Sequence, residues 1–548
     1  MNARFLADPL PPVDHRPDHW ESLYPERDLP AGAQVTRFAP SPTGFVHIGG
    51  VYVALISKSV AHATGGSYFV RIEDTDQLRA VGEADEQFAR AFSYFGVESD
   101  ESLVQVPWGP YRQSQRVDIY VTYVRELLES GLAYPCFCSR EELATAAERQ
   151  RAAKVPTGYY GEWATCRTLT EADVAARLAQ GLPSVIRFRS PGLDGVRATY
   201  DDAIRGTIEQ DDNRNDIVLL KTGEPGRRLP TYHLAHVVDD HLMRVNLVIR
   251  GDEWISSVPL HLQLFSALGF EAPTYAHIAP LMKKDGPSKR KLSKRKDPEA
   301  AVDFYIAEGY PAIAVLHYLR GLANARLADR PIDEVATESI RLTECSVAGP
   351  LVDLDKLTDI SSNFIADLPG TTVLDEVASW AQRNDPDLLP VLQESRDLAL
   401  RALDVERGDV ENKRKDLAKW SDFRPVYGFF FPQVFELVTD PGDERFGTVP
   451  PPVVVDLASD FVDGYRSDTD QPRWFQQIRA LADSQGFAPN AKAYKADPER
   501  YVGMLRDAAS VIRVLLTGST RSPDLHAVAS VLGEDEVKRR VGAVREQA

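Results

Sequence analysis

The stretch that most constrains the fold of this chain runs from Arg37 to Gly50 and reads Arg-Phe-Ala-Pro-Ser-Pro-Thr-Gly-Phe-Val-His-Ile-Gly-Gly. The residues Val35–Phe38 are typical of a short strand, and the prolines and glycine that follow interrupt regular backbone hydrogen bonding. The apolar run Val51–Ala61 is then long enough for a helix. The pattern is strand, tight turn and helix N-terminus, an arrangement whose free backbone N–H groups can hold a phosphate.

His47 lies in this turn and can donate a hydrogen bond to a phosphate oxygen, while Gly49 and Gly50 would let a flat base approach the backbone. The same residues also fit an ordinary loop between a strand and a helix, with a solvent-facing histidine. Short glycine motifs often occur by chance, so the stretch alone leaves both interpretations open.

A second stretch, Lys283–Lys296, is rich in lysine and arginine and contains Lys291-Leu-Ser-Lys-Arg295. Taken by itself, such a run indicates either a loop that binds anions or simply a solvated, charged surface.

Together the two stretches resemble the two signature motifs of class I aminoacyl-tRNA synthetases, in the wording of the bacterial-type glutamyl-tRNA synthetases. Two further stretches support the resemblance: Arg71-Ile-Glu-Asp-Thr-Asp76 and Tyr232-His-Leu-Ala-His-Val-Val-Asp-Asp240. The resemblance covers most of the chain from Val35 onward. It implies an α/β protein with a Rossmann-like, parallel-sheet catalytic domain that is split by an α+β insertion and followed by all-α C-terminal domains.

We divide the 548 residues accordingly. The parts are an N-terminal extension (1–34), the first half of the Rossmann-like domain (35–135), an acceptor-binding insertion with a zinc knuckle (136–225), the second half of the Rossmann-like domain (226–300), a helical stem-contact region (301–400) and a helical anticodon-binding region (401–548). Family members usually begin close to the first motif, so the extension departs from the pattern. We expect it to be a strap packed on the catalytic domain.

Hydrophobic patterns predict the individual elements. Strands are expected at Ser67–Ile72, Pro183–Arg189, Tyr200–Gln210 and Leu247–Arg250. Helices are expected at Arg112–Gly131, Arg140–Lys154, Pro230–His241, Tyr310–Asn324, Asp397–Leu417, Pro452–Tyr465 and Asp497–Leu516.

The resemblance implies a site for ATP with Mg²⁺, the metal being implied by the triphosphate alone. His47, Lys291 and Lys294 would be the catalytic residues, because activation requires donors and cations that neutralise charge on the departing pyrophosphate. The residues implied to bind ATP are Thr43, His47, Gly49, Gly50, Glu253, Trp254 and Lys294.

The resemblance also implies a glutamate pocket. Arg37 would bind the side-chain carboxylate with Ser41 beside it, and Tyr232 and Arg250 would form walls. Glu73 would meet the substrate ammonium, although its spacing alone favours a solvated turn.

One position of this pocket departs from the family, because His236 stands where relatives often have asparagine. Both side chains donate hydrogen bonds. A histidine there predicts a pH dependence of glutamate binding near neutrality.

Three of the four cysteines cluster, at Cys136, Cys138 and Cys166, which suits a tetrahedral zinc site that lacks one ligand. Relatives complete the site with a tyrosine four residues before the last cysteine, where this chain has Glu162. The fourth ligand is therefore open, with Tyr160 first and Glu162 second. The alternative is that the cysteines pack as small hydrophobic residues.

The formal net charge of −18 counts against a generic nucleic-acid binder but allows local basic patches. The chain has no apolar run of about eighteen residues, no secretory signal and few cysteines, which predicts a cytoplasmic protein without a membrane span. We expect a monomer that charges tRNA-Glu with L-glutamate, and charging of tRNA-Gln stays open. The alternatives are a synthetase-derived ligase that glutamylates a non-tRNA acceptor and a catalytically silent RNA-binding module.

Overall fold

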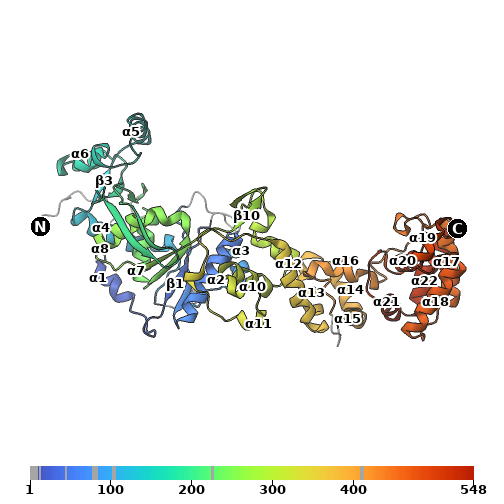
Figure 1. Ribbon diagram of the computed structural model, residues 1–548. Helices are drawn as coiled ribbons and strands as arrows, with labels where there is room; N and C mark the ends of the chain where they lie inside the picture. The colour runs from blue at the N-terminus through green and yellow to red at the C-terminus, as the bar shows by residue number, and fades with distance from the viewer. Residues whose placement is uncertain are drawn as a thin grey trace. The chain divides into compact units, whose positions relative to one another are not determined.

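The computed structural model describes residues 10, 14–42, 46–76, 84–101, 107–223, 228–405, 407 and 413–547. The chain forms two compact units, which we call the α/β unit (Met1–Tyr305 and Leu316–Asp353) and the helical unit (Ile306–Val315 and Leu354–Ala548). All strands of the described residues belong to the α/β unit (Figure 1). None of the helices in the described part of the chain is long and apolar enough to cross a membrane.

The central sheet of the α/β unit consists of two parallel pairs. Strand β1 (Val35–Phe38) pairs with β2 (Ser67–Val70), and β8 (Leu247–Gly251) pairs with β9 (Thr274–Ile278). The side chain of Asn246, directly before β8, accepts a hydrogen bond from the backbone N–H of Val35, so the two pairs lie side by side. The parallel sheet predicted from the sequence is therefore present, although the strand expected over Ser67–Ile72 already ends at Val70.

Helices pack on this sheet through buried apolar faces. Helix α2 (Ile48–Ala63) begins three residues earlier than the apolar run suggested, because Gly49 and Gly50 form its first turn. The helix expected over Arg112–Gly131 is a 3₁₀ turn followed by α4 (Val117–Glu129). The other helices of this part are α3 (Ala84–Phe95), α7 (Tyr232–Leu242) and α8 (Val258–Leu268).

The region between the two pairs contains a second sheet. Strands β3 (Ala133–Cys136), β4 (Val185–Phe188) and β7 (Val218–Leu220) form this antiparallel sheet. Helix α5 (Arg140–Ala152) begins at a capping box in which Ser139 and Glu142 bond each other's backbone N–H groups. Helix α6 (Glu171–Ala179) has a similar box, and in Figure 1 both helices stand away from the central sheet.

The strand expected over Tyr200–Gln210 is a hairpin instead. It consists of β5 (Arg197–Asp202) and β6 (Gly206–Asp211), and the chain turns at Gly206, whose φ of +70° favours glycine. Asp202 of β5 also pairs in parallel with Tyr275 of β9. The hairpin therefore extends the central sheet at the edge formed by β9.

The basic stretch is only partly a loop. Its first half forms an antiparallel hairpin of β10 (Met282–Asp285) and β11 (Ser288–Lys291). Lys294 and Arg295 follow three and four residues after the last residue of this hairpin. The chain continues into α9 (Val302–Glu308), α10 (Ala312–Ala323) and α11 (Ile332–Val335).

The segment before β1 contains helix α1 (Pro17–Leu23) and contacts α4 and the end of α7. The indole N–H of Trp20 donates to Thr122 Oγ1 at 3.0 Å, and the hydroxyl of Tyr24 donates to the carbonyl of Gly109 at 2.8 Å. The side chain of Arg27 donates to the carbonyl of Met243 at 3.0 Å. These are the contacts of a strap on the α/β unit.

The helical unit contains two apolar cores, one around Phe423 and Tyr427 and one around Trp474 and Leu515. Its helices are α12 (Leu354–Asp367), α13 (Gly370–Asn384), α14 (Leu388–Glu394), α15 (Arg396–Asp404), α16 (Phe423–Tyr427), α17 (Pro451–Gly464), α18 (Gln471–Ser484), α19 (Ala491–Ala496), α20 (Leu505–Thr517), α21 (Leu525–Leu532) and α22 (Glu534–Gly542).

Two predicted helices of this unit are too long. The helix expected to reach Leu417 ends at Asp404, because Val405 adopts an extended conformation. The helix expected from Asp497 begins only at Leu505. The carboxylate of Asp507 accepts a hydrogen bond from the backbone N–H of Met504, which fixes the first turn at this position.

A buried ion network joins the strap to the centre of the α/β unit. The hydroxyl of Tyr24 accepts a hydrogen bond from Arg116, which in turn donates to Asp239 Oδ1 at 2.7 Å. The other oxygen of Asp239 accepts hydrogen bonds from Tyr120 and Gln113 at 2.8 and 2.9 Å. Asp239 and Arg116 are fully buried, so each charge depends on the other for its solvation.

The substitution Asp239→Asn should therefore destabilise the protein by about 3–5 kcal/mol, since it leaves buried Arg116 without its counter-charge. The free energy of unfolding can be measured by urea denaturation. The matched control is Asp211→Asn, at an exposed pair with Arg197, where the loss should stay below about 1 kcal/mol. Equal losses at the two positions would contradict the role of the buried network.

Candidate active site

A cavity of about 460 Å³ opens at the carboxyl ends of the central strands. Its lining includes Arg37 and Phe38 of β1, Arg250 of β8 and Ile278 of β9. Ligands bind at this edge in open parallel sheets, because the loops that follow the strands converge there.

The N-terminus of α2 forms one wall of the cavity. His47 is the residue before the helix, and its Nδ1 accepts a hydrogen bond from the backbone N–H of Gly49 at 2.8 Å. Since Nδ1 is the acceptor, the proton of the neutral ring is on Nε2. Burial, together with the charges of Lys294 and Lys291, lowers the pKa of His47 against the opposing effect of a hydrogen bond to the backbone of Leu292, so the ring is a neutral donor at pH 7.

Little space is left for a side chain at the glycines of this turn. A Cβ atom at Gly50 would lie 3.1 Å from the ring of Phe38, and one at Gly49 would lie 2.9 Å from His47 Nδ1. Both glycines line the cavity. Thr43, the other residue expected to bind ATP in this turn, lies outside the described residues.

The basic hairpin contributes one residue to the cavity. Lys291 lines it and lies 3.7 Å from a carboxylate oxygen of Glu253, which also lines it together with Trp254. Lys294 lies outside the lining, but its charge acts on His47. The two signature stretches, which are far apart in the sequence, therefore meet at this wall.

Three predicted residues of the glutamate pocket, Arg37, Ser41 and Glu73, also line the cavity. Arg37 Nε lies 3.2 Å from both carboxylate oxygens of Asp240. Arg71 joins Asp240, at 2.6 Å, to Glu73, at 3.3 Å. Burial raises the pKa of Glu73 to about 7, against the opposing effect of Arg71 and Arg37.

The prediction for His236 needs correction. Its side chain is fully buried, with Nδ1 2.8 Å from Asp240 Oδ2 and Nε2 3.1 Å from the hydroxyl of Tyr275. It stacks behind Tyr232 and is not part of the cavity lining. Burial lowers the pKa of His236 to about 3, so this ring does not titrate near neutrality.

Tyr232 and Arg250, the predicted walls of the glutamate pocket, both line the cavity, and Arg250 Nη1 donates to the Tyr232 hydroxyl at 3.1 Å. The ring of Trp254 packs on Tyr232 at a centroid distance of 4.2 Å. The guanidinium of Arg250 lies over the ring of Trp254, 5.9 Å from its centroid.

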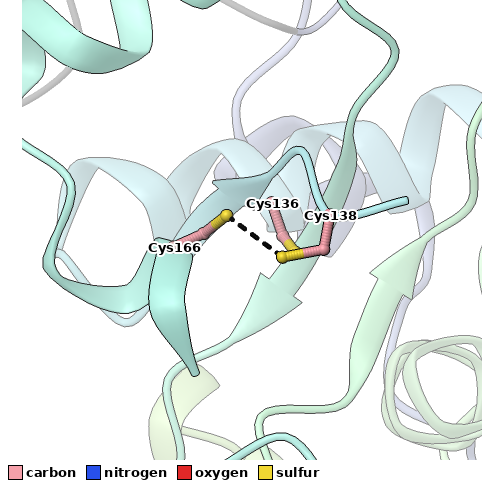
Figure 2. Close-up of side chains that lie close together, drawn as sticks. All are labelled: Cys136, Cys138 and Cys166. Carbon is pink, nitrogen blue, oxygen red and sulfur yellow. Dashed lines mark hydrogen bonds between the residues drawn. The ribbon is translucent and has the colours of Figure 1, made fainter. Parts of the chain in front are cut away.

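The three predicted thiols lie together at the end of β3 and the turn near Cys166. The Sγ atoms of Cys138 and Cys166 are 3.6 Å apart and face each other (Figure 2). All three Sγ atoms lie within 4.8 Å of one another. Hydrogen bonds with the thiols of Cys138 and Cys166 hold the pKa of Cys136 well below its usual range.

The tyrosine at this cluster is Tyr159 and not Tyr160. The hydroxyl of Tyr159 lies 3.4 Å from Cys136 Sγ and 3.2 Å from Cys138 Sγ. The hydroxyl of Tyr160 donates instead to the carbonyl of Pro156 at 2.5 Å, and Glu162 is exposed. The two tyrosines are neighbours, so one residue of register in an irregular segment decides which of them reaches the thiols.

The sequence analysis did not identify the buried residues that support the side chains lining the cavity. They are Arg71, Arg116, Asp202, Asp239, Asp240, His261 and His277, all of them buried. One signal was available, since two consecutive aspartates in the apolar pattern of α7 demand buried partners.

A parallel sheet whose carboxyl edge combines a His-Ile-Gly-Gly helix N-terminus with a Lys-Leu-Ser-Lys-Arg segment defines the catalytic domain of a class I aminoacyl-tRNA synthetase. Residues 34–358 match the family described as "tRNA synthetases class I (E and Q), catalytic domain", and residues 503–545 match "Anticodon binding domain". The chain belongs to this class I (E and Q) family.

Similar proteins extend over nearly the whole chain. The glutamate--tRNA ligase of Clostridium beijerinckii is 40% identical and is matched over 98% of this chain and 99% of its own. That of Acetivibrio thermocellus is 39% identical over 99% of each chain. These relatives share the segment before Val35, which is therefore not an addition peculiar to this sequence.

Solved structures support the fold. The glutamate tRNA ligase from Elizabethkingia meningosepticum, solved in complex with its amino acid, superposes with a TM-score of 0.75 at 27% identity. The alignment covers 94% of this chain and 99% of that one.

The pKa of Glu73 predicts a pH dependence of glutamate binding that His236 does not cause. Below pH 7 Glu73 is mostly protonated, and a neutral carboxyl group would lose the pairing with the substrate ammonium that the sequence predicts for this residue, so we expect the affinity for L-glutamate to fall about tenfold from pH 8 to pH 6. Isothermal titration calorimetry at the two pH values measures this change.

Glu73→Gln serves as the control, because an amide does not titrate. This variant should bind glutamate weakly and with nearly equal affinity at both pH values. An unchanged tenfold difference in the variant would assign the titration to another group.

Proposed function

We propose that this chain is an ATP-dependent glutamate--tRNA ligase. The observation that carries the proposal is a single cavity lined by His47 and Lys291, which we assign to the phosphates, and by Arg37 and Glu73, which we assign to the amino acid. The full-length similarity to glutamate--tRNA ligases supports the same activity.

In the first step, the α-carboxylate of glutamate attacks the α-phosphate of ATP, which gives glutamyl-adenylate and pyrophosphate. No protein nucleophile is needed, because the work is positioning and neutralisation of charge. His47 donates from Nε2 to a phosphate oxygen, and Lys291 and Lys294 stabilise the departing pyrophosphate. Mg²⁺ accompanies the triphosphate and offsets its charge.

The nucleoside part of ATP occupies the space between the two walls. Gly49 and Gly50 leave room for the base against the start of α2. Glu253 and Trp254, in the 3₁₀ helix after β8, line the same cavity and are assigned to ATP. Thr43 completes the proposed ATP site.

The amino acid is selected by the charges of the opposite wall. Arg37 and Arg250 attract the side-chain carboxylate, with Ser41 and Tyr232 as neutral neighbours. Glu73 pairs with the ammonium, which itself favours the ionised form of a carboxyl group whose pKa is close to 7. His236 does not contact the substrate in this proposal; it bonds Asp240 and stacks on Tyr232, and so holds both side chains in place.

In the second step, a ribose hydroxyl of the 3′-terminal adenosine of tRNA-Glu attacks the activated carbonyl, and AMP leaves. The insertion between the two halves of the sheet is the part assigned to the acceptor end. The helices over residues 503–545, which match an anticodon-binding domain, are assigned to the other end of the tRNA. We propose that the enzyme works as a monomer in the cytoplasm.

We further propose that Cys136, Cys138, Cys166 and Tyr159 hold a structural zinc ion. Four ligands at tetrahedral corners about 2.3 Å from zinc lie roughly 3.8 Å apart. The 3.6 Å between Cys138 and Cys166 and the 3.2 Å from Cys138 to the Tyr159 hydroxyl are close to this spacing. When bound, the ion would tie the end of β3 to the turn near Cys166.

Zinc content tests this assignment independently of catalysis. Wild-type protein should contain about one zinc per chain by mass spectrometry, and Cys138→Ser should lose it. Tyr159→Phe should release zinc to a chromophoric chelator at least about tenfold faster, whereas the neighbouring Tyr160→Phe should behave as wild type. Zinc-free wild-type protein, or equal release from both tyrosine variants, would contradict the assignment.

The activity itself is tested by charging with labelled L-glutamate, ATP and Mg²⁺, using purified tRNA-Glu and tRNA-Gln separately. We expect charging of tRNA-Glu. Additional charging of tRNA-Gln would mean an enzyme that also supplies glutamyl-tRNA-Gln for amidation. Charging of neither by folded, ATP-binding protein would refute the proposal and favour a ligase with a non-tRNA acceptor.

A further inference from the structure

Arg250 is a nearly buried cation whose partners are all neutral. Its side chain donates to a tyrosine hydroxyl, two histidine rings and a backbone carbonyl, that of Trp254 at 3.5 Å. Within the described part of the chain it forms no ion pair, in contrast to the other buried arginines of this region. Arg37, Arg71 and Arg116 each contact Asp239 or Asp240.

The first histidine is His277 on β9. Its Nε2 accepts a hydrogen bond from Arg250 Nε at 3.1 Å, and its Nδ1 lies 2.6 Å from Asp202 Oδ2. An arginine N–H can be accepted only by an unprotonated ring nitrogen, so the proton of His277 is on Nδ1 and faces Asp202. Asp202 is fixed in turn by the backbone N–H groups of Ile204 and Arg205.

The second histidine is His261 on α8. Its Nδ1 lies 3.3 Å from Arg250 Nη2, and its Nε2 lies 3.0 Å from His233 Nδ1. By the same reasoning, His261 accepts from Arg250 at Nδ1 and donates from Nε2 to His233. The two histidines thus use opposite ring nitrogens toward the arginine.

This arrangement fixes a guanidinium without cancelling its charge. A carboxylate in place of either ring would also orient Arg250, but it would neutralise the cation that the substrate carboxylate needs. Burying a charge without a counter-ion costs desolvation free energy, and an anion that binds beside the charge offsets this cost.

We propose that His277, held by Asp202, and His261, held by His233, are positioning residues that keep Arg250 oriented and without a counter-ion for the carboxylate of the substrate. The inference rests on the proposed function, since it takes glutamate to be that substrate. It assigns a role in substrate binding to β5, because Asp202 ends this strand.

Amide substitutions test the proposal, because asparagine places a polar atom near the Nδ1 position of histidine and glutamine near the Nε2 position. At position 277, His277→Gln keeps an acceptor for Arg250 and His277→Asn does not. At position 261 the order reverses, since His261→Asn keeps the acceptor and His261→Gln does not. A role that depends only on side-chain size would not reverse between the two positions.

The measurement is the dissociation constant of L-glutamate by calorimetry, together with that of ATP. We expect His277→Asn and His261→Gln to weaken glutamate binding at least about tenfold, the loss of a hydrogen bond to a charged group, and the other two variants to weaken it less than about threefold. ATP binding should change less than about twofold in all four.

His62→Asn is the matched control, because His62 forms a similar pair with Asp100 on the exposed surface and should bind glutamate as wild type does. Equal losses for both amides at 277 and at 261, or parallel losses of ATP affinity, would overturn the proposal. If one position does not tolerate substitution, the ordering at the other decides.

Glutamate binding and tRNA charging by the wild-type protein distinguish a failure of this inference from a failure of the proposed function. Protein that binds glutamate but charges no tRNA would refute the ligase activity and leave the ordering of the four variants readable. Wild-type protein that binds no glutamate would refute both.

Discussion

The structure of the α/β unit depends on the burial of two consecutive aspartates, Asp239 and Asp240, among three arginines. Buried charges of this kind are tolerated only when every partner is present, because each unpaired ion would cost several kcal/mol. The partners come from different elements: Arg37 from β1, Arg71 after β2 and Arg116 before α4. A single helix, α7, therefore requires these elements to assemble around it. The strap is part of this requirement, since Tyr24 bonds Arg116.

The same network determines what the cavity can do. Arg37 enters it already paired with Asp240, but Arg71 shares this carboxylate, so the charge of Arg37 is only partly balanced. Glu73 lies beside Arg71, yet burial outweighs this neighbour and its pKa stays near 7. A substrate ammonium can therefore ionise Glu73 at little cost. Arg250, which has neutral partners, supplies the attraction for an anion. The roles of Arg37, Glu73 and Arg250 therefore follow from how far other groups of the protein already balance the charge of each side chain.

The sequence was sufficient for features that local chemistry dictates. The strand and turn before His47, the parallel strands and the residues that follow them could be predicted, because proline, glycine and apolar runs constrain the backbone directly. It was insufficient for properties that depend on the folded environment of a residue. His236 carries an ordinary imidazole, and only its burial against Asp240 and Tyr275 removes its titration. Tyr159 and Tyr160 differ by one residue of register. The start of α20 depends on a cap from Asp507 that a hydrophobic pattern does not report.

The hairpin of β5 and β6 was expected to belong to the insertion, and its actual position connects two parts of the enzyme. It joins the central sheet at one register pair, Asp202 with Tyr275, and at that point the Asp202 side chain reaches His277. Two hydrogen bonds then separate the hairpin from the guanidinium of Arg250. A displacement of β5 would change these two hydrogen bonds. Asp202 and His277 are buried, so water would not replace a lost partner. The placement of the hairpin and the geometry of the amino-acid pocket are consequently set together.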